Sequence, residues 1–209
     1  MPTVLSESPE VVERVSDGFR LPLSRHLVEI LEQQGELVGR YELIDGELIN
    51  KMGQNRPHSY TLNLIAKWLR HNFTDAFVQT QQPIEVENAD RELNYPEPDV
   101  AVLTISWEEL LDRDPEPHEV ALAVEISAST LRMDRTTKVA LYARAEIVEY
   151  WIVDVNGRAI FVHRSPENGQ YSEITRYAEN ERVSCLAKPD ADVLVSELII
   201  PVKSGEGAE

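Results

Sequence analysis

Apolar residues recur along the chain with two different spacings, which predict helices alternating with strands. Residues 57–73 carry apolar side chains three and four positions apart, a spacing that places them on one face of a helix. A shorter stretch of the same kind covers residues 23–34. Short apolar runs predict strands instead. These runs lie at 77–86, 98–103, 121–127 and 148–154.

Turn and capping residues separate these elements. Asp45-Gly46 stands between two copies of ELI, and Asn156-Gly157 follows the strand at 148–154, so both pairs predict hairpins. Ser106 is expected to open a short helix over 106–113. Asp134 is expected to cap a helix over 135–145. Helices alternate with strands early in the chain and strands dominate its last third, which predicts an α/β or α+β fold with a mixed sheet flanked by helices.

Length and composition narrow the class of protein. With 209 residues, 42% of them hydrophobic, we expect a single domain over 21–203, preceded by a flexible acidic leader at 1–20 and followed by a disordered tail at 204–209. The single cysteine, Cys185, excludes an internal disulfide and favours a reducing cytoplasm. No run reaches the roughly 18 uninterrupted apolar residues of a membrane span, so we expect no membrane association.

Two acidic residues lie inside the predicted strands. Glu125 interrupts the apolar run ALAVEIS, and Asp99 opens the strand in YPEPDVAVL. If these strands pair, the two carboxylates can lie about 4.8 Å apart. Two like charges at roughly that distance repel by about 4 kcal/mol at an effective dielectric constant of 20. The pair therefore requires a shared proton or a cation.

Lys138 is a candidate for the compensating charge. On the predicted helix it shares a face with Leu141 and Tyr142, a face suited to packing on the sheet. Two acids and an inward lysine are the components of metal-assisted phosphodiester hydrolysis, in which carboxylates hold Mg²⁺ or Mn²⁺. The pattern predicts Asp99 and Glu125 as metal ligands and Lys138 as a catalytic lysine.

The same residues resemble a known family. PEPDV, VEIS and DRTTKVALYARAEIVEYWIVD are similar to restriction-endonuclease-like proteins of the PD-(D/E)XK nuclease superfamily. Ser127 departs from the parent pattern because it stands at the lysine position. The resemblance implies that Lys138 replaces that lysine, that Glu47 in YELIDGELI is an auxiliary catalytic acid near the metal, and that His58 is a substrate-binding residue of the site. It also implies a restriction-endonuclease-like fold, a DNA substrate and a divalent metal.

The charge distribution bears on the substrate. The chain carries a net charge of −17, which disfavours binding to nucleic acid. Residues 126–145 nevertheless hold four basic side chains and one acidic side chain, and Arg132 and Arg135 are candidate phosphate-binding residues. Two alternatives therefore stay open: a non-catalytic binding or regulatory module, and a hydrolase of smaller phosphate esters. A homodimer is expected for an enzyme that cuts both strands of DNA.

Simpler interpretations of each residue also remain. Asp99 could cap a turn after Pro98, Glu125 could form a structural ion pair with an arginine, and Lys138 could be an ordinary surface lysine. Tyr150 and Trp151 are expected to pack within the sheet or at a dimer contact. The nuclease hypothesis therefore depends on the three charged residues meeting at one place.

Overall fold

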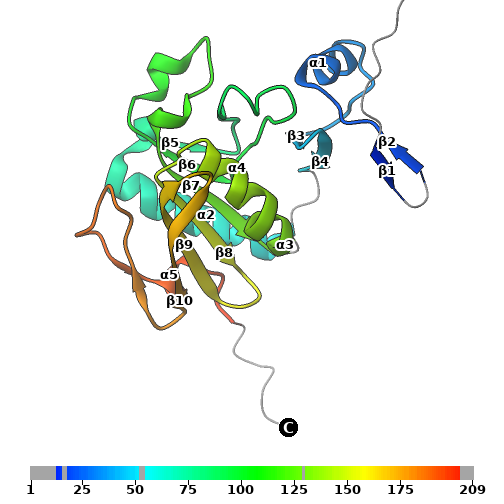
Figure 1. Cartoon of the computed structure of the whole chain (residues 1–209). Coiled ribbons are helices and arrows are strands. Elements are labelled where there is room, and N and C mark those ends of the chain that lie inside the picture. Colours follow the sequence, from blue (N-terminus) through cyan, green and yellow to red (C-terminus); the bar gives the residue numbers. More distant parts are fainter. Residues whose placement is uncertain (1–12, 16–17, 52–54, 129, 203–209) are drawn as a thin grey trace, which may run out of the picture.

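A computed structural model describes residues 13–15, 18–51, 55–128 and 130–202 (Figure 1). Its centre is a six-stranded sheet in the order β10-β9-β8-β7-β6-β5. β7 and β8 are parallel, and the other neighbouring strands are antiparallel. The mixed sheet predicted from the sequence is confirmed. The strands are β5 (Val78–Thr80), β6 (Val100–Leu103), β7 (Val120–Ser127), β8 (Glu149–Asp154), β9 (Ala159–Glu167) and β10 (Gln170–Ala178).

Helices cover both faces of the sheet (Figure 1). α2 (Arg56–Phe73) begins after the N-cap Asn55 and buries Ile65 and Leu69 against one face. The opposite face is covered by the crossover between β7 and β8, a continuous helical stretch with a π-helical turn in its middle. This stretch consists of α3 (Leu131–Met133), η4 (Asp134–Lys138) and α4 (Val139–Arg144). Side chains of β6 alternate between the two layers, as a strand requires.

The hairpin of β3 (Tyr41–Ile44) and β4 (Glu47–Asn50) forms as predicted. Asp45 and Gly46 both have positive φ, 48° and 75°, which is the backbone of a type I′ turn. A bridge between Leu43 and Tyr95 holds the hairpin against the segment that leads into β6. The hairpin therefore brings its own side chains toward the end of the central sheet.

Short elements complete the described part of the chain. β1 and β2 pair within the predicted leader. The boundaries at residues 20, 21 and 203 stay predictions, because residues 1–12, 16–17 and 203–209 lie outside the described residues. The remaining elements are β1 (Glu13–Val15), β2 (Gly18–Arg20), α1 (Arg25–Gln33), η1 (Asp75–Phe77), η2 (Trp107–Leu110), η3 (Pro117–Glu119), β11 (Arg182–Val183), β12 (Val193–Leu194) and α5 (Val195–Leu198).

Three predicted elements differ from the structure. The helix expected over 106–113 is a short 3₁₀ helix over Trp107–Leu110, although Ser106 caps it as expected. The strand expected over 77–86 ends at Thr80, because Gln81 has a φ of 53° and the backbone N–H of Ile84 donates outside the ladder, to Pro96. The helix expected over 135–145 begins earlier, at Leu131. Asp134 therefore lies inside the helix and does not cap it.

Tyr150 and Trp151 are both fully buried within the described chain. Trp151 stacks on Trp68 at a centroid distance of 6.0 Å, and Tyr150 packs edge-on against Tyr142. The packing role is confirmed, and a dimer contact through these two rings is ruled out by their burial. Cys185 is a free, buried thiol whose pKa is raised by burial to about 11.

The turn of the hairpin gives a first prediction. A Cβ added at Gly46 would lie 2.4 Å from Cβ of Pro22, at a φ of +75°. We expect Gly46→Ala to destabilise the protein by about 1–2 kcal/mol from the backbone conformation and a further 1–3 kcal/mol or so from the clash. Gly35 is a matched control because it has a φ of +74° and no heavy atom within 4 Å of the added Cβ. Equal losses for the two alanine variants in urea denaturation would contradict the clash.

Candidate active site

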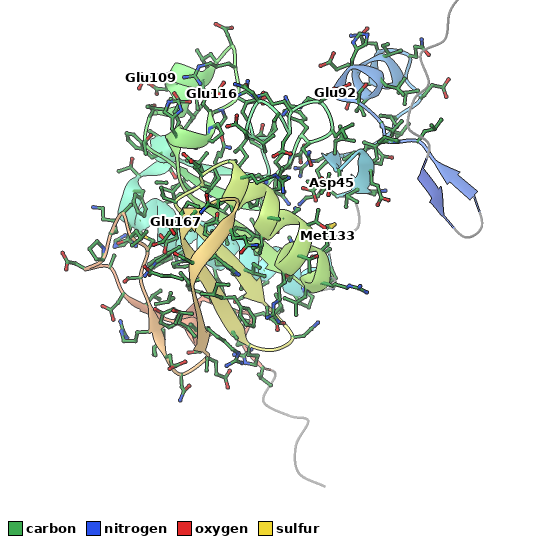
Figure 2. All side chains as sticks on the ribbon, in the orientation of Figure 1. Asp45, Glu92, Glu109, Glu116, Met133 and Glu167 are labelled. Carbon is green, nitrogen blue, oxygen red and sulfur yellow. The ribbon has the colours of Figure 1, made fainter. Side chains whose placement is uncertain are left out.

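Buried ionisable side chains from four parts of the chain meet around a cavity of about 140 Å³. The hairpin, the N-terminus of α2, the paired strands β6 and β7, and the helical crossover all contribute to its lining. Met133, labelled in Figure 2, lies on α3 and lines the same cavity. The ionisable residues are Glu42, Lys51, His58, Asp99, Glu125, Asp134 and Lys138.

Lys138 lies between two carboxylates. Its Nζ is 2.8 Å from Oε1 of Glu125 and 2.8 Å from Oε2 of Glu42, and its side chain is only 1% exposed. The hydroxyl of Tyr142, one helical turn later, donates to the same oxygen of Glu125 at 3.0 Å. The π-helical turn ends at Lys138, and such turns are frequent at functional sites. Lys138 is therefore the cation that the buried carboxylate of Glu125 requires.

The protonation states of this pair follow from burial and charge. Burial raises the pKa of Glu125 to about 8, although the ammonium groups of Lys138 and Lys51 oppose this shift. Burial would lower the pKa of Lys138, but Glu125 and Glu42 raise it above its usual value. Because Lys138 and Tyr142 both donate to the same oxygen, the geometry is that of an ammonium ion facing a carboxylate.

Asp99 is held from two sides. Nε2 of His58 lies 3.0 Å from Oδ2 of Asp99, and the backbone N–H of Ile126 donates to the same oxygen at 2.8 Å. Burial alone would raise the pKa of Asp99, but the hydrogen bond from His58, the charge of Lys51 and the Ile126 N–H lower it to about 2. Asp99 is therefore a carboxylate at neutral pH.

Lys51, which follows β4, points into the middle of the acidic residues. Its Nζ lies 3.7 Å from Oδ1 of Asp99, 3.8 Å from Oε1 of Glu42 and 3.8 Å from Oε2 of Glu125. It also donates to the carbonyl of Glu97 at 3.1 Å. Burial would lower the pKa of Lys51, but the three carboxylates raise it overall. The ammonium thus occupies the point that the three carboxylates share.

Asp134 contributes a fourth buried carboxylate to the lining. Its Oδ2 accepts hydrogen bonds from the hydroxyls of Ser127 at 2.5 Å and Thr130 at 2.6 Å. Ser127 thus orients Asp134 and ties the end of β7 to the helical crossover. The expected capping role of Asp134 is wrong, since its hydrogen bonds point to the strand and loop before the helix.

The structure brings together four of the residues singled out from sequence and separates the other three. Asp99, Glu125, Lys138 and His58 meet at the cavity, where His58 contacts Asp99. Glu47 is exposed on β4 and does not line the cavity. Glu42 of the same hairpin, 1% exposed, lies where Glu47 was expected. Sequence reasoning missed Glu42 and Lys51, although an acid inside the apolar strand YELI carries the same signal as Glu125.

The expected basic region does not form a continuous surface. Lys138 is buried, and Arg144 pairs with Asp90 at 2.7 Å. Arg135 is exposed, with its guanidinium 4.4 Å from the centroid of the Phe161 ring, and Arg132 is also exposed. Neither arginine lines the cavity. Acidic side chains project from several parts of the molecule, including the labelled Glu92, Glu109 and Glu167 (Figure 2).

The donor set suits a hard divalent cation, but the three carboxylate oxygens that face Lys51 lie 3.7–3.8 Å from its Nζ. Carboxylate oxygens are the preferred ligands of Mg²⁺, at about 2.0–2.1 Å. In the described part of the chain, no group of three or more His, Cys, Asp and Glu side chains is arranged to hold a metal ion as it stands. The closest arrangement is the ring of Glu42, Asp99 and Glu125 around Lys51. A divalent ion there would require these carboxylates to move inward or to bind it through water.

A mixed sheet with two carboxylates at the ends of two adjacent strands and a buried lysine on the helix that follows is the arrangement of a restriction-endonuclease-like protein. The chain belongs to the Uma2 family, described as "Putative restriction endonuclease", whose profile matches residues 28–194. A crystal structure from Anabaena variabilis ATCC 29413, described as "a putative nuclease belonging to DUF820", has a similar fold. It is 15% identical with a TM-score of 0.58, and the match covers 80% of this chain and 96% of that one.

No curated protein matches the chain. None of the helices in the described ranges is long and apolar enough to cross a membrane. Family membership supports nuclease as the class of function.

Proposed function

We propose that the protein is a metal-dependent phosphodiesterase of the PD-(D/E)XK type that cuts DNA. The observation that carries this proposal is the convergence of Glu42, Asp99 and Glu125 on one cavity, with Lys138 bound between two of them. These three carboxylates would hold Mg²⁺ or Mn²⁺. When bound, such an ion supplies Lewis-acid stabilisation of charge on a phosphate and acidifies bound water.

The residues of the chain have separate tasks in this proposal. Lys138 holds Glu42 and Glu125 in position, because an oxygen of each side chain lies 2.8 Å from its ammonium. An ammonium has three N–H donors, so Lys138 has a third to offer to a phosphate oxygen or to the attacking water. Its positive charge there would stabilise the charge that develops on the phosphate. Asp99 is oriented by His58 and by the backbone of Ile126.

Plasmid nicking tests the proposal directly. The wild-type protein is expected to convert supercoiled plasmid to the open circle with Mg²⁺ or Mn²⁺ and to stop when EDTA is added. Asp99→Ala is expected to remove this activity, because the carboxylate is a proposed metal ligand. Nicking that continues unchanged in EDTA or in the Asp99 variant would disprove the assignment.

A second candidate substrate is a smaller phosphate diester. The net charge of −17 and the small cavity of about 140 Å³ favour it, because a short ester avoids the repulsion between DNA and an acidic surface. Cleavage of plasmid, RNA and bis(p-nitrophenyl) phosphate should be compared at low salt. Turnover of the model ester alone would favour this candidate over DNA.

His58 supports the site through Asp99. We expect His58→Ala to reduce nicking or metal affinity by about 10–100-fold, the usual cost of removing a hydrogen-bond partner of a metal ligand. His71 is a matched control because it is exposed on the same helix, α2. Wild-type metal affinity and nicking in the His58 variant would show that Asp99 needs no support from the imidazole.

A homodimer is part of the same proposal, since cutting both strands requires two sites. It would place two copies of the cavity on one DNA duplex. Light scattering with a mass of about 47 kDa is expected, twice the 23.7 kDa of the chain. A mass near 24 kDa at the concentrations used for nicking would rule the dimer out.

A further inference from the structure

Lys51 and Lys138 face the same acidic residues in different ways. Lys138 is 1% exposed and lies 2.8 Å from two carboxylate oxygens, which are direct charged hydrogen bonds. Lys51 is 9% exposed and lies 3.7–3.8 Å from one oxygen of each of three carboxylates. Those distances exceed a hydrogen bond. Electrostatic attraction and the hydrogen bond to Glu97 therefore hold the Lys51 ammonium in place.

The three oxygens around Lys51 differ from those bound by Lys138 or His58. Lys138 binds Oε2 of Glu42 and Oε1 of Glu125, whereas Lys51 faces Oε1 of Glu42 and Oε2 of Glu125. His58 binds Oδ2 of Asp99, whereas Lys51 faces Oδ1. Each carboxylate thus turns its second oxygen toward one point, and a positive charge occupies that point.

We propose that Lys51 is a counter-cation built into the site, which occupies the divalent-metal position and must withdraw from it before the metal binds. This inference rests on the proposed metal-dependent function and adds a competition to it. A lysine has a flexible four-carbon side chain, and Lys51 already has access to solvent, so its ammonium can leave without moving the hairpin. Lys138 remains in place because its ammonium donates hydrogen bonds directly to Glu42 and Glu125.

The competition has a consequence for metal affinity. An ammonium at the metal position neutralises part of the negative charge that would attract the ion. The Lys51 ammonium must therefore leave this position when the metal enters it. Replacing Lys51 by an uncharged side chain of similar length removes the competitor. Metal affinity should then rise, which is the opposite of what is expected when a metal-supporting residue is lost.

Calorimetric titration with Mn²⁺ tests this consequence. Lys51→Met is expected to lower the Kd for Mn²⁺ at least tenfold relative to wild type. Lys67→Met is the matched control, because Lys67 is exposed on α2 and its replacement makes the same change in net charge. The control should bind Mn²⁺ as the wild type does. A Kd in the Lys51 variant equal to or higher than that of the wild type would overturn the proposal.

A second measurement uses the wild-type protein alone, in case the variant does not fold. Acetylation by acetic anhydride, read at each lysine by mass spectrometry, reports how exposed each amine is. Lys51 is expected to react at least fivefold faster with saturating Mn²⁺ than with EDTA, while Lys138 stays unreactive in both. Binding of Mn²⁺ with no increase at Lys51 would refute the competition and leave the metal site intact. Absence of any Mn²⁺ binding to the wild type would instead remove the proposed function itself.

Discussion

Lys138→Met is expected to lower the free energy of unfolding by about 3–5 kcal/mol, the usual cost of removing one partner of a buried ion pair. Lys138 is fully buried and binds both Glu42 and Glu125, so methionine leaves two buried carboxylates without their nearest positive charge. Nicking is expected to disappear as well. Denaturant unfolding followed by circular dichroism measures the first effect.

A double variant separates the charge from the packing. Methionine matches the length of lysine, and Glu125→Gln removes one of the carboxylates that Lys138 compensates. The Glu125→Gln, Lys138→Met pair is therefore expected to recover part of the stability lost by Lys138→Met, since interacting residues are not additive. Losses that simply add would show that Lys138 and Glu125 do not stabilise each other.

Glu42→Gln is expected to lower metal-dependent nicking by about a hundredfold or more, because a lost ligand gives up several kcal/mol of metal-based stabilisation. Glu47→Gln is expected to leave nicking at the wild-type level. Both glutamates lie on the same hairpin, but Glu42 is 1% exposed at the cavity and Glu47 is exposed outside it. Rates of plasmid nicking at saturating Mn²⁺ compare the two.

This pair also tests the resemblance by which Glu47 was chosen. Loss of nicking in the Glu47 variant with retention in the Glu42 variant would restore the original prediction. It would also mean that the hairpin changes its position when the protein acts. Equal effects of the two substitutions would indicate a general sensitivity of the hairpin to charge.

The meeting of Asp99, Glu125 and Lys138 at one cavity could be predicted from the sequence because the strands carry a strong signal. A carboxylate inside an apolar strand must be compensated, and Glu125 and Asp99 both have this feature. The pairing of β6 with β7 and the position of Lys138 on the next helix follow from ordinary strand and helix geometry. The predicted mixed sheet, the helix over 57–73 and the Asp45-Gly46 hairpin also follow from local patterns of apolar and turn residues.

The remaining errors concern long-range contacts that local patterns do not encode. Whether Glu42 or Glu47 faces the site depends on which side of the hairpin lies against the segment at Tyr95, and that contact spans about fifty residues of chain. The convergence of Lys51 on the same carboxylates has the same origin. Residues 126–145 do not form the expected basic surface, because Lys138 points inward and Arg144 pairs with Asp90, which lies 54 positions earlier.

The central claim is that Glu42, Asp99 and Glu125 together form the site for a divalent ion. A crystal grown or soaked with Mn²⁺ and measured for anomalous scattering tests it most directly. We expect a peak among these three carboxylates, near the point that the Lys51 ammonium occupies, with the side chain of Lys51 turned away. A well-ordered site at saturating Mn²⁺ with no peak there, or a peak bound by other residues, would contradict it.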